Sequence, residues 1–219
     1  YVAEKADSAC EPKPRYWVCR DEVLARTADA PLSLRNAFAA QDIAAMAKSL
    51  TVWLTLLDNI PLETDMRQYM KDRYGFSTEL PDNVCWYAEA RKKEFADCTP
   101  LCEAEKESLI DADLSEWVRK LMEERSPRWF LGWRDVTNAT NERTVIASVL
   151  PQSGVGNSLS IGIISSENRP FSGCLLANLE SVVVDYIARF KVAGVNLSYF
   201  YIKQLPILPP TAYTPADIS

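Results

Sequence analysis

A dense run of polar side chains lies in the second half of the chain, just before a mostly apolar segment. Between positions 134 and 144, nine of the eleven residues carry charged, amide or hydroxyl side chains, and the segment 145–150 follows. They are Arg134, Asp135, Thr137, Asn138, Thr140, Asn141, Glu142, Arg143 and Thr144. Arg and Asn side chains place two hydrogen-bonding groups in one plane, which suits them to bind base edges or phosphate groups. The run is therefore a candidate for nucleic-acid recognition.

The same residues also allow a purely structural interpretation. Asp135 and Asn138 can stabilise local turns by accepting hydrogen bonds from nearby backbone N–H groups. Arg134 can pair with Asp135 or Glu142, and such surface pairs are common in loops. Both interpretations stay open for Arg134 and Arg143.

The loop 151–157, PQSGVGN, adds further polar candidates. Its small residues let a backbone approach a ligand closely, and Gln152, Ser153 and Asn157 could bind DNA there. The loop lacks the lysine of a P-loop and the GxGxxG spacing, so a nucleotide-phosphate cradle is not expected. A plain connection between two strands is the alternative.

The last candidate residues for DNA contacts lie near a predicted turn at Gly194. They are Lys191, Asn196, Tyr199 and Lys203. We expect at least one residue of the aromatic run 199–201 to be packed, because side chains of an extended segment alternate between faces.

Two separated segments carry a family resemblance. They are WFLGWRDVTNATNERTVIASVLP at 129–151 and NLSYFYIKQLPILPP at 196–210. Together they resemble the region that follows the catalytic domain in large adenine-specific DNA methyltransferases of type II (IIG-like) restriction-modification and related phage-defence systems. The ending at Gln204-Leu205-Pro206 is similar to that of recognition domains in type I specificity subunits. The resemblance covers about 129–210, is weaker at 14–18, and is absent over about 30–125.

The resemblance implies a chain that recognises DNA for methylation catalysed elsewhere. Expected partners are double-stranded DNA and an upstream methyltransferase domain or partner subunit, and S-adenosylmethionine is expected in that upstream domain. The candidate DNA contacts are Arg134, Asn138, Asn141, Arg143, Gln152, Asn157, Lys191, Asn196 and Lys203. The chain begins with Tyr1, so it is expected to be a fragment of such a protein.

Catalytic residues are not expected in this chain. Amino-methylating enzymes use an Asn or Asp followed by Pro-Pro and an aromatic to hold the target amine of a flipped base, and no such string occurs. The nearest match, Asn168-Arg169-Pro170-Phe171, lacks the first proline. Without a histidine, a Ser or Cys nucleophile has no usual base. Asp185 and Arg189 lie four residues apart and are expected to pair with each other. The parent would be the adenine methyltransferase, with or without nuclease activity.

The charge distribution argues against strong DNA affinity of the chain alone. Residues 1–130 carry 18 Lys and Arg against 24 Asp and Glu, and residues 131–219 carry 6 against 6. Autonomous DNA-binding proteins usually show a basic face. The cluster 91–93, RKK, is flanked by glutamates, so a solvated helix face is favoured over a phosphate contact. The alternative function is a protein-interaction scaffold within a phage-defence complex.

Six cysteines raise the question of metal binding. Cys98 and Cys102 could join Cys10 and Cys19 in a thiolate site, but paired CxxC knuckles are missing. No apolar signal segment or span of about 18 residues occurs, so reduced thiols, no bound metal and a cytoplasmic location are expected.

The hydrophobic pattern predicts an α+β fold in three parts: a lead-in over 1–30, a helical spacer over 31–127, and an α/β recognition-like module over 128–219. Helices are expected at about 21–26, 33–58, 62–74, 83–96 and 103–124. Strands are expected at 129–133, 144–150 and 159–165, with an extended segment at 14–18. One long buried helix is expected over 175–190, followed by an extended segment that ends at Pro206.

Overall fold

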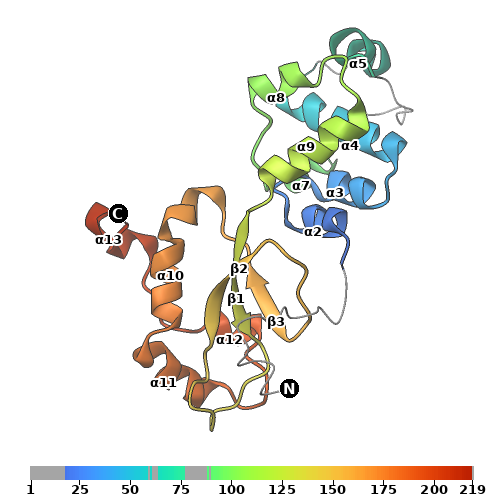
Figure 1. Cartoon of the computed structure of the whole chain (residues 1–219). Helices are drawn as coiled ribbons and strands as arrows, with labels where there is room; N and C mark the ends of the chain where they lie inside the picture. Colours follow the sequence, from blue (N-terminus) through green and yellow to red (C-terminus); the bar gives the residue numbers. More distant parts are fainter. Residues whose placement is uncertain (1–17, 59, 61–63, 77–87, 89, 219) are drawn as a thin grey trace, which may run out of the picture.

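Apolar residues at helical spacing fold the first half of the chain into a helical lobe, and the second half folds around a small sheet (Figure 1). The computed structural model describes residues 18–58, 60, 64–76, 88 and 90–218. The helical lobe contains α2 (Arg20–Thr27), α3 (Leu32–Ala39), α4 (Ile43–Leu57), α5 (Met66–Tyr74), α7 (Lys92–Ala96), α8 (Glu103–Ser108) and α9 (Leu114–Arg125). The chain then passes from α9 almost directly into the first strand of the sheet lobe. The predicted α+β class is confirmed.

Helix α4 forms the centre of the helical lobe. Every residue from Met46 to Thr55 except Lys48 is buried, and Trp53 is only 1% exposed. The core around it includes Phe38 from α3 and Met122 from α9. Burial of such large apolar side chains is the main stabilising contribution in a lobe of this kind.

The predicted helix over 33–58 is instead two helices. Gln41 adopts a left-handed conformation with φ 54° and separates α3 from α4. The side chain of Asp42 then accepts a hydrogen bond from the N–H of Ala45 at 3.0 Å and caps the new helix.

The predicted helix over 103–124 is also divided. Asp111, with φ 56°, turns the chain between α8 and α9, and its N–H donates to the carbonyl of Tyr74 at 3.3 Å. Asp113 caps α9 by accepting from the N–H of Glu116 at 2.8 Å. The prediction at 21–26 matches α2, and that at 62–74 matches α5. Most of 83–91 and of 14–18 lies outside the described residues.

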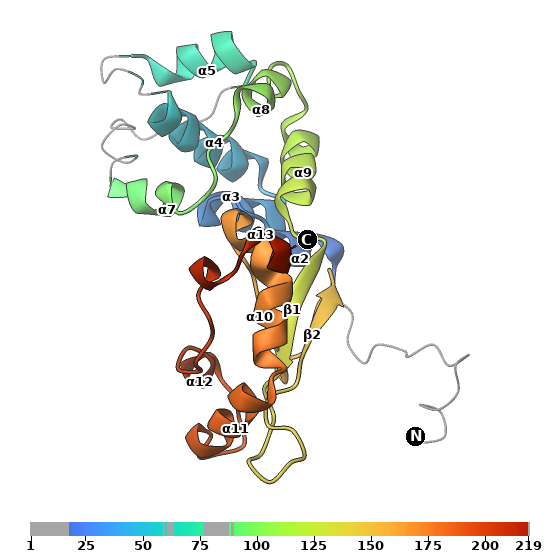
Figure 2. The same ribbon diagram turned by 90° about the vertical axis from the view of Figure 1, so that its left-hand side faces the viewer.

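The sheet lobe is built on three antiparallel strands in the order β2-β1-β3. They are β1 (Trp129–Arg134), β2 (Ala147–Pro151) and β3 (Leu159–Gly162). On one face, Leu131 and Trp133 pack with residues of α10 (Ser172–Leu179) and α11 (Val182–Lys191), as the period of two requires. Figure 2 shows α10 lying along the sheet and α11 at the end far from the helical lobe.

The predicted long buried helix over 175–190 is corrected in two respects. The chain breaks at Glu180, and the side chain of Ser181 caps α11 by accepting from the N–H of Val184 at 3.2 Å. Only one side of α11 is buried, and its outer side exposes apolar residues. These are Val182, Val183, Tyr186 and Phe190, which we call the α11 stripe.

The closing segment also differs from the prediction. Residues Tyr199–Ile202 form the short helix α12 rather than an extended segment. The remaining elements are the 3-10 helices η1 (Ser166–Phe171) and η2 (Pro210–Ala212) and the short helix α13 (Pro215–Ile218). Among the described helices, no single one is long and apolar enough to cross a membrane. The segments 168–179 and 182–191, which meet at a bend of 68°, reach the required length and apolar character only when they are taken together.

The predicted domain boundaries stay predictions. Within the predicted lead-in, α2 packs against α3 and α9, so this part lies in the helical lobe.

Candidate functional site

The two segments that carry the family resemblance meet in the sheet lobe. Val136 and Asn196 form an antiparallel bridge. The N–H of Thr137 donates to the carbonyl of Val195 at 2.8 Å, and the indole Nε1 of Trp133 donates to the carbonyl of Leu197 at 2.9 Å. Segments about 60 residues apart in the sequence are thus joined by backbone contacts into one unit.

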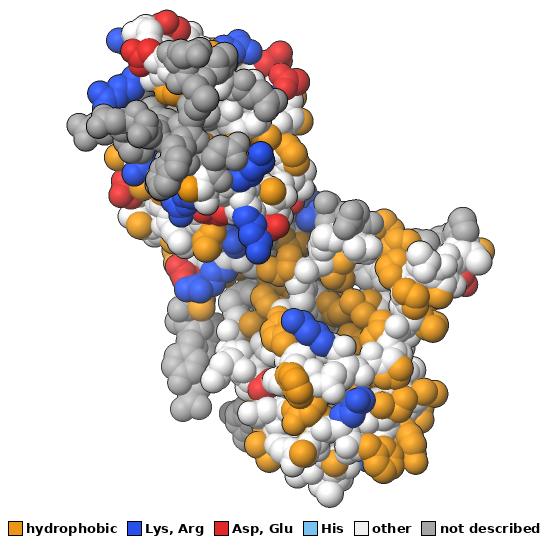
Figure 3. Space-filling view, turned by 180° about the vertical axis from the view of Figure 1, so that it is seen from behind, with side chains coloured by type: hydrophobic (Ala, Val, Ile, Leu, Met, Phe, Trp, Pro, Cys, Tyr) orange, Lys and Arg blue, Asp and Glu red, His pale blue; other side chains and the backbone are white. Residues whose placement is uncertain are grey.

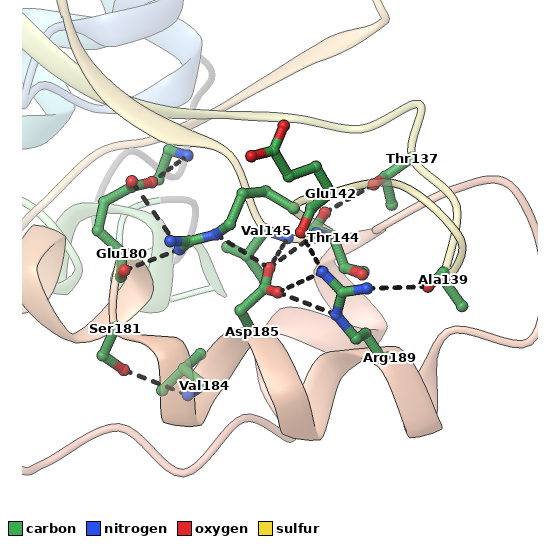
Figure 4. A network of polar contacts seen from close by, with 12 residues as sticks. Thr137, Ala139, Glu142, Thr144, Val145, Glu180, Ser181, Val184, Asp185 and Arg189 are labelled. Carbon is green, nitrogen blue, oxygen red and sulfur yellow. Dashed lines mark hydrogen bonds and ion pairs between the residues drawn. The ribbon is translucent and has the colours of Figure 1, made fainter.

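A buried carboxylate holds the polar loop that follows β1 (Figure 4). Asp185, on α11, is 4% exposed. Its Oδ1 accepts from the N–H groups of Thr144 and Val145 at 2.7 and 2.8 Å. Its Oδ2 accepts from Nε and Nη2 of Arg189 at 3.1 and 3.0 Å, which confirms the predicted pair.

Arg189 extends the network to the tip of the loop. Its Nη1 donates to the carbonyl of Ala139 at 3.3 Å, and its Nη2 donates to the carbonyl of Glu142. Within the loop, the hydroxyl of Thr137 donates to the carbonyl of Thr144 at 2.6 Å. The loop 137–145 is therefore fastened to α11 at several points, which preorganises its exposed side chains.

The electrostatics of Asp185 follow from these contacts. Burial alone would raise its pKa, because a charged carboxylate is poorly solvated inside the lobe. The hydrogen bonds from the N–H of Val145, from Arg189 and from the N–H of Thr144 outweigh burial and hold the pKa below its usual value. Asp185 is an ionised structural anchor.

Arg143, a candidate DNA contact, lies within the same network. Its Nη2 donates to the carbonyl of Glu180 at 2.7 Å, and its Nε lies 3.4 Å from Oδ1 of Asp185. The side chain is 35% exposed. This geometry favours the structural interpretation of Arg143, although part of its guanidinium still faces solvent.

Arg134 has a different environment. It is exposed at the end of β1, and among the described residues it forms no ion pair, so the pairing with Asp135 or Glu142 is not seen. Its Cα partner across the sheet is Leu159, and the N–H of Asp135 donates to the carbonyl of Ser158 at 2.9 Å. The structure therefore places Arg134 close to the chain around Asn157.

Four exposed candidates gather at this end of the sheet, which we call the distal end. They are Arg134, Asn138, Asn157 and Asn196. Asn196 is placed there by its bridge to Val136. Asn138 uses its Oδ1 to accept from the N–H and the hydroxyl of Thr140 at 3.0 and 3.1 Å, as a local turn requires. Asn141 is half-buried in the same loop.

The other three candidates are Lys191, Lys203 and Gln152. Lys191 ends α11, and Lys203 follows α12. Gln152 lies at the opposite end of the sheet, where its N–H donates to the carbonyl of Arg128 at 2.9 Å. It lines a cavity of about 560 Å³ between the two lobes.

The aromatic run 199–201 includes one anchored ring. The ring of Tyr199 meets that of Trp133 edge to face at 4.7 Å between centroids, and its hydroxyl donates to the carbonyl of Ile161. Burial raises the pKa of Tyr199. This contact confirms the expected packing of at least one of these residues.

The described cysteines do not converge on a metal site. In the part of the chain that the structure describes, no group of three or more Cys, Asp or Glu side chains could hold an ion. Cys98 donates to the carbonyl of Glu94 at 3.3 Å, and burial raises the pKa of its thiol to about 11. Cys10 and Cys85 lie outside the described residues.

Sequence reasoning did not single out two exposed cations that line the cavity between the lobes. Arg128 precedes β1, and Arg169 lies in η1. Arg169 stands out in the sequence only as part of an incomplete methyltransferase motif, and a single arginine before a strand gives no signal of its own.

Comparisons of the chain with protein-family models, with curated proteins and with solved structures gave no match.

Proposed function

We propose that this chain recognises double-stranded DNA and positions it for adenine methylation by an upstream domain of the same protein. One observation carries the proposal. The two segments that resemble the recognition region of adenine methyltransferases are hydrogen-bonded into one unit, through Trp133, Thr137 and Asn196. A single recognition module requires its segments to be joined in this way.

The distal end supplies groups suited to reading DNA. The guanidinium of Arg134 can donate two parallel hydrogen bonds to a guanine edge or a phosphate, and the amides of Asn157 and Asn196 can pair with an adenine edge. All three residues are exposed. Hydrogen bonds with Asp185 and Arg189 fix the loop 137–145 before DNA binds. This preorganisation lowers the entropy cost of binding.

The remaining candidates fit supporting roles. Lys191 and Lys203 would contact phosphates, which position a protein on a duplex without reading its sequence. Arg143 would orient the loop through Glu180 and Asp185. Part of the affinity would come from the upstream domain, because residues 131–219 carry no net charge.

Photo-crosslinking of the full-length protein to duplex DNA tests the proposal. A photoreactive amino acid in place of Asn157 should crosslink to DNA. The same replacement at Lys71, an exposed residue of α5 in the helical lobe, is the matched control and should crosslink far less. Equal or no crosslinking at the two positions would contradict a DNA-reading role for the distal end.

The α11 stripe supports a second candidate function, a protein-interaction scaffold within a phage-defence complex. Val182 and Phe190 are 77% and 75% exposed, and Tyr186 stacks edge to face on Phe190 at 5.0 Å. Hydrophobic side chains gather over α11 at the lower right of Figure 3. Clustered exposed apolar side chains commonly mark protein contacts. Salt-insensitive binding of a partner protein without DNA affinity would favour this function.

A further inference from the structure

The junction of the two lobes is hollowed by two adjoining cavities. One has a volume of about 560 Å³ and the other about 940 Å³. Both are lined by Ile163, Ile164 and Arg169, so they form one continuous cleft, which we call the interlobe cleft. Figure 3 shows the surface hollowed between the lobes, with hydrophobic side chains in the hollow and Lys or Arg side chains beside it.

Basic side chains of both lobes line the interlobe cleft. Arg128 and Arg169 come from the sheet lobe, and Arg35 and Lys93 come from the helical lobe. Among the described residues, none of these four forms an ion pair with a carboxylate. The cleft therefore presents cations from two directions toward the same space.

Most acidic side chains that line the cleft already have partners. Glu123 lies 3.3 Å from Arg20, and Glu94 lies 3.0 Å from Arg91 and accepts from the N–H of Ser33 at 2.6 Å. Asp29 accepts from the hydroxyl of Thr99 at 2.6 Å. Seven basic side chains and five acidic ones line the two cavities, so the cleft carries an excess of positive charge in an acidic protein.

Arg35 places a guanidinium at the wall of the cleft. Its Nη1 donates to the carbonyl of Arg26 at 3.2 Å, whereas its Nε is buried and has no hydrogen-bond acceptor among the described residues. The buried Nε cannot itself contact a ligand in the cleft, so Arg35 contributes its charge and the remaining N–H groups of its guanidinium. Phosphate oxygens are strong acceptors for guanidinium groups.

We propose that the interlobe cleft binds phosphate groups of the DNA backbone, held by Arg128 and Arg169 from one lobe and by Arg35 and Lys93 from the other. Gln152 and the 40% exposed ring of Trp129 line the same space and provide a polar and an apolar contact for the adjoining sugars. This inference rests on the proposed function and gives the helical lobe a part in it. DNA bound across the cleft would fix the orientation of the two lobes.

The test measures how salt weakens binding of a fluorescent duplex to the full-length protein. Each phosphate that a protein neutralises contributes about 0.9 to the slope of log affinity against log salt concentration. The variant R128A/R169A should therefore bind more weakly, with a slope smaller by about 2. The variant K71A/R73A removes the same charge from exposed positions of α5 outside the cleft and should keep the wild-type slope. Thermal unfolding of each variant checks that the fold is intact.

The possible outcomes separate this inference from the proposed function. If R128A/R169A keeps the slope of K71A/R73A while R134A weakens binding, the cleft inference is overturned and the proposed function stands. If the wild-type full-length protein binds no duplex at low salt, both are contradicted. If a nucleoside triphosphate binds the wild type in the cleft and does not compete with duplex, the cleft is a nucleotide site and the inference is overturned.

Discussion

Asp185 and Arg189 lie one turn apart on α11, and the carboxylate of the first binds the guanidinium of the second at 3.0 and 3.1 Å. Between them they hold four backbone groups of the polar loop: the N–H groups of Thr144 and Val145 and the carbonyls of Ala139 and Glu142. The loop that looked most suited to recognition thus owes its shape to a helix about 40 residues later in the sequence.

Replacing the buried carboxylate should destabilise the protein. The variant D185N removes the charge that balances Arg189 and places an amide donor against donors. We expect the free energy of unfolding in urea to fall by about 2–3 kcal/mol, since breaking a buried, hydrogen-bonded charge pair is costly. The variant E107Q, at an exposed position of α8, should stay within about 0.5 kcal/mol of the wild type. Equal effects of the two variants would show that the network is not a structural anchor.

The same carboxylate should make stability depend on acidity. The folded protein holds the pKa of Asp185 below the usual value, so the unfolded state binds the proton more readily. The stabilising contribution of Asp185 is therefore present above the unfolded pKa of about 4 and is lost as the pH falls through the folded pKa. The difference in unfolding free energy between wild type and D185N should be constant near neutral pH and shrink below about pH 4. A difference that grows on acidification would refute this assignment.

Replacement of two arginines of the sheet lobe by alanine should change the unfolding free energy by different amounts. R143A removes the hydrogen bond to the carbonyl of Glu180 and the contact with Asp185, so we expect a loss of about 1 kcal/mol in unfolding free energy. R134A removes an exposed side chain with no ion pair among the described residues and should change it by less than about 0.5 kcal/mol. Urea denaturation of both variants checks the contrast. A larger loss for R134A would mean that the two roles are reversed.

Two glycines provide a matched test of the backbone. Gly75 caps α5 with φ 78°, and a Cβ there would lie 2.5 Å from Oδ1 of Asp111. We expect G75A to destabilise the protein by about 1 kcal/mol or more, because L-residues rarely adopt this conformation. Gly173 lies in the first turn of α10, and a Cβ there would meet no atom within 4 Å. G173A should be neutral or stabilise by up to about 1 kcal/mol, and thermal unfolding measures both changes.

Local sequence patterns predicted the fold class and most element positions but missed several helix ends. The breaks at Gln41 and Asp111 use left-handed residues that are not glycine, and no proline or glycine marks either position. Both conformations are supported by tertiary contacts, such as the hydrogen bond from Asp111 to Tyr74, that local patterns do not encode. The break before α11 is different, because the cap provided by Ser181 is a local signal that the prediction of one long helix overlooked.

The position of the candidate site could be predicted from the sequence. The roles of its individual residues could be predicted less well. Residues 134–144 are polar enough to identify the loop, and the spacing of Asp185 and Arg189 identified their pairing. The sequence could not tell which loop arginine would face α11, because Arg143 and Arg134 differ only in their tertiary surroundings. The interlobe cleft was not predicted either, since its cations come from segments scattered between residues 35 and 169.

The proposed role of the distal end, reading DNA for an adenine methyltransferase, is tested most directly by a map of methylated adenines. DNA treated with the full-length protein, or with its R134A/N196A variant, would be sequenced to locate every methylated adenine. We predict that the variant methylates additional sites or loses methylation while unfolding at the wild-type temperature. Methylation of the same sites at the same rate by the variant would contradict a DNA-reading role for the distal end.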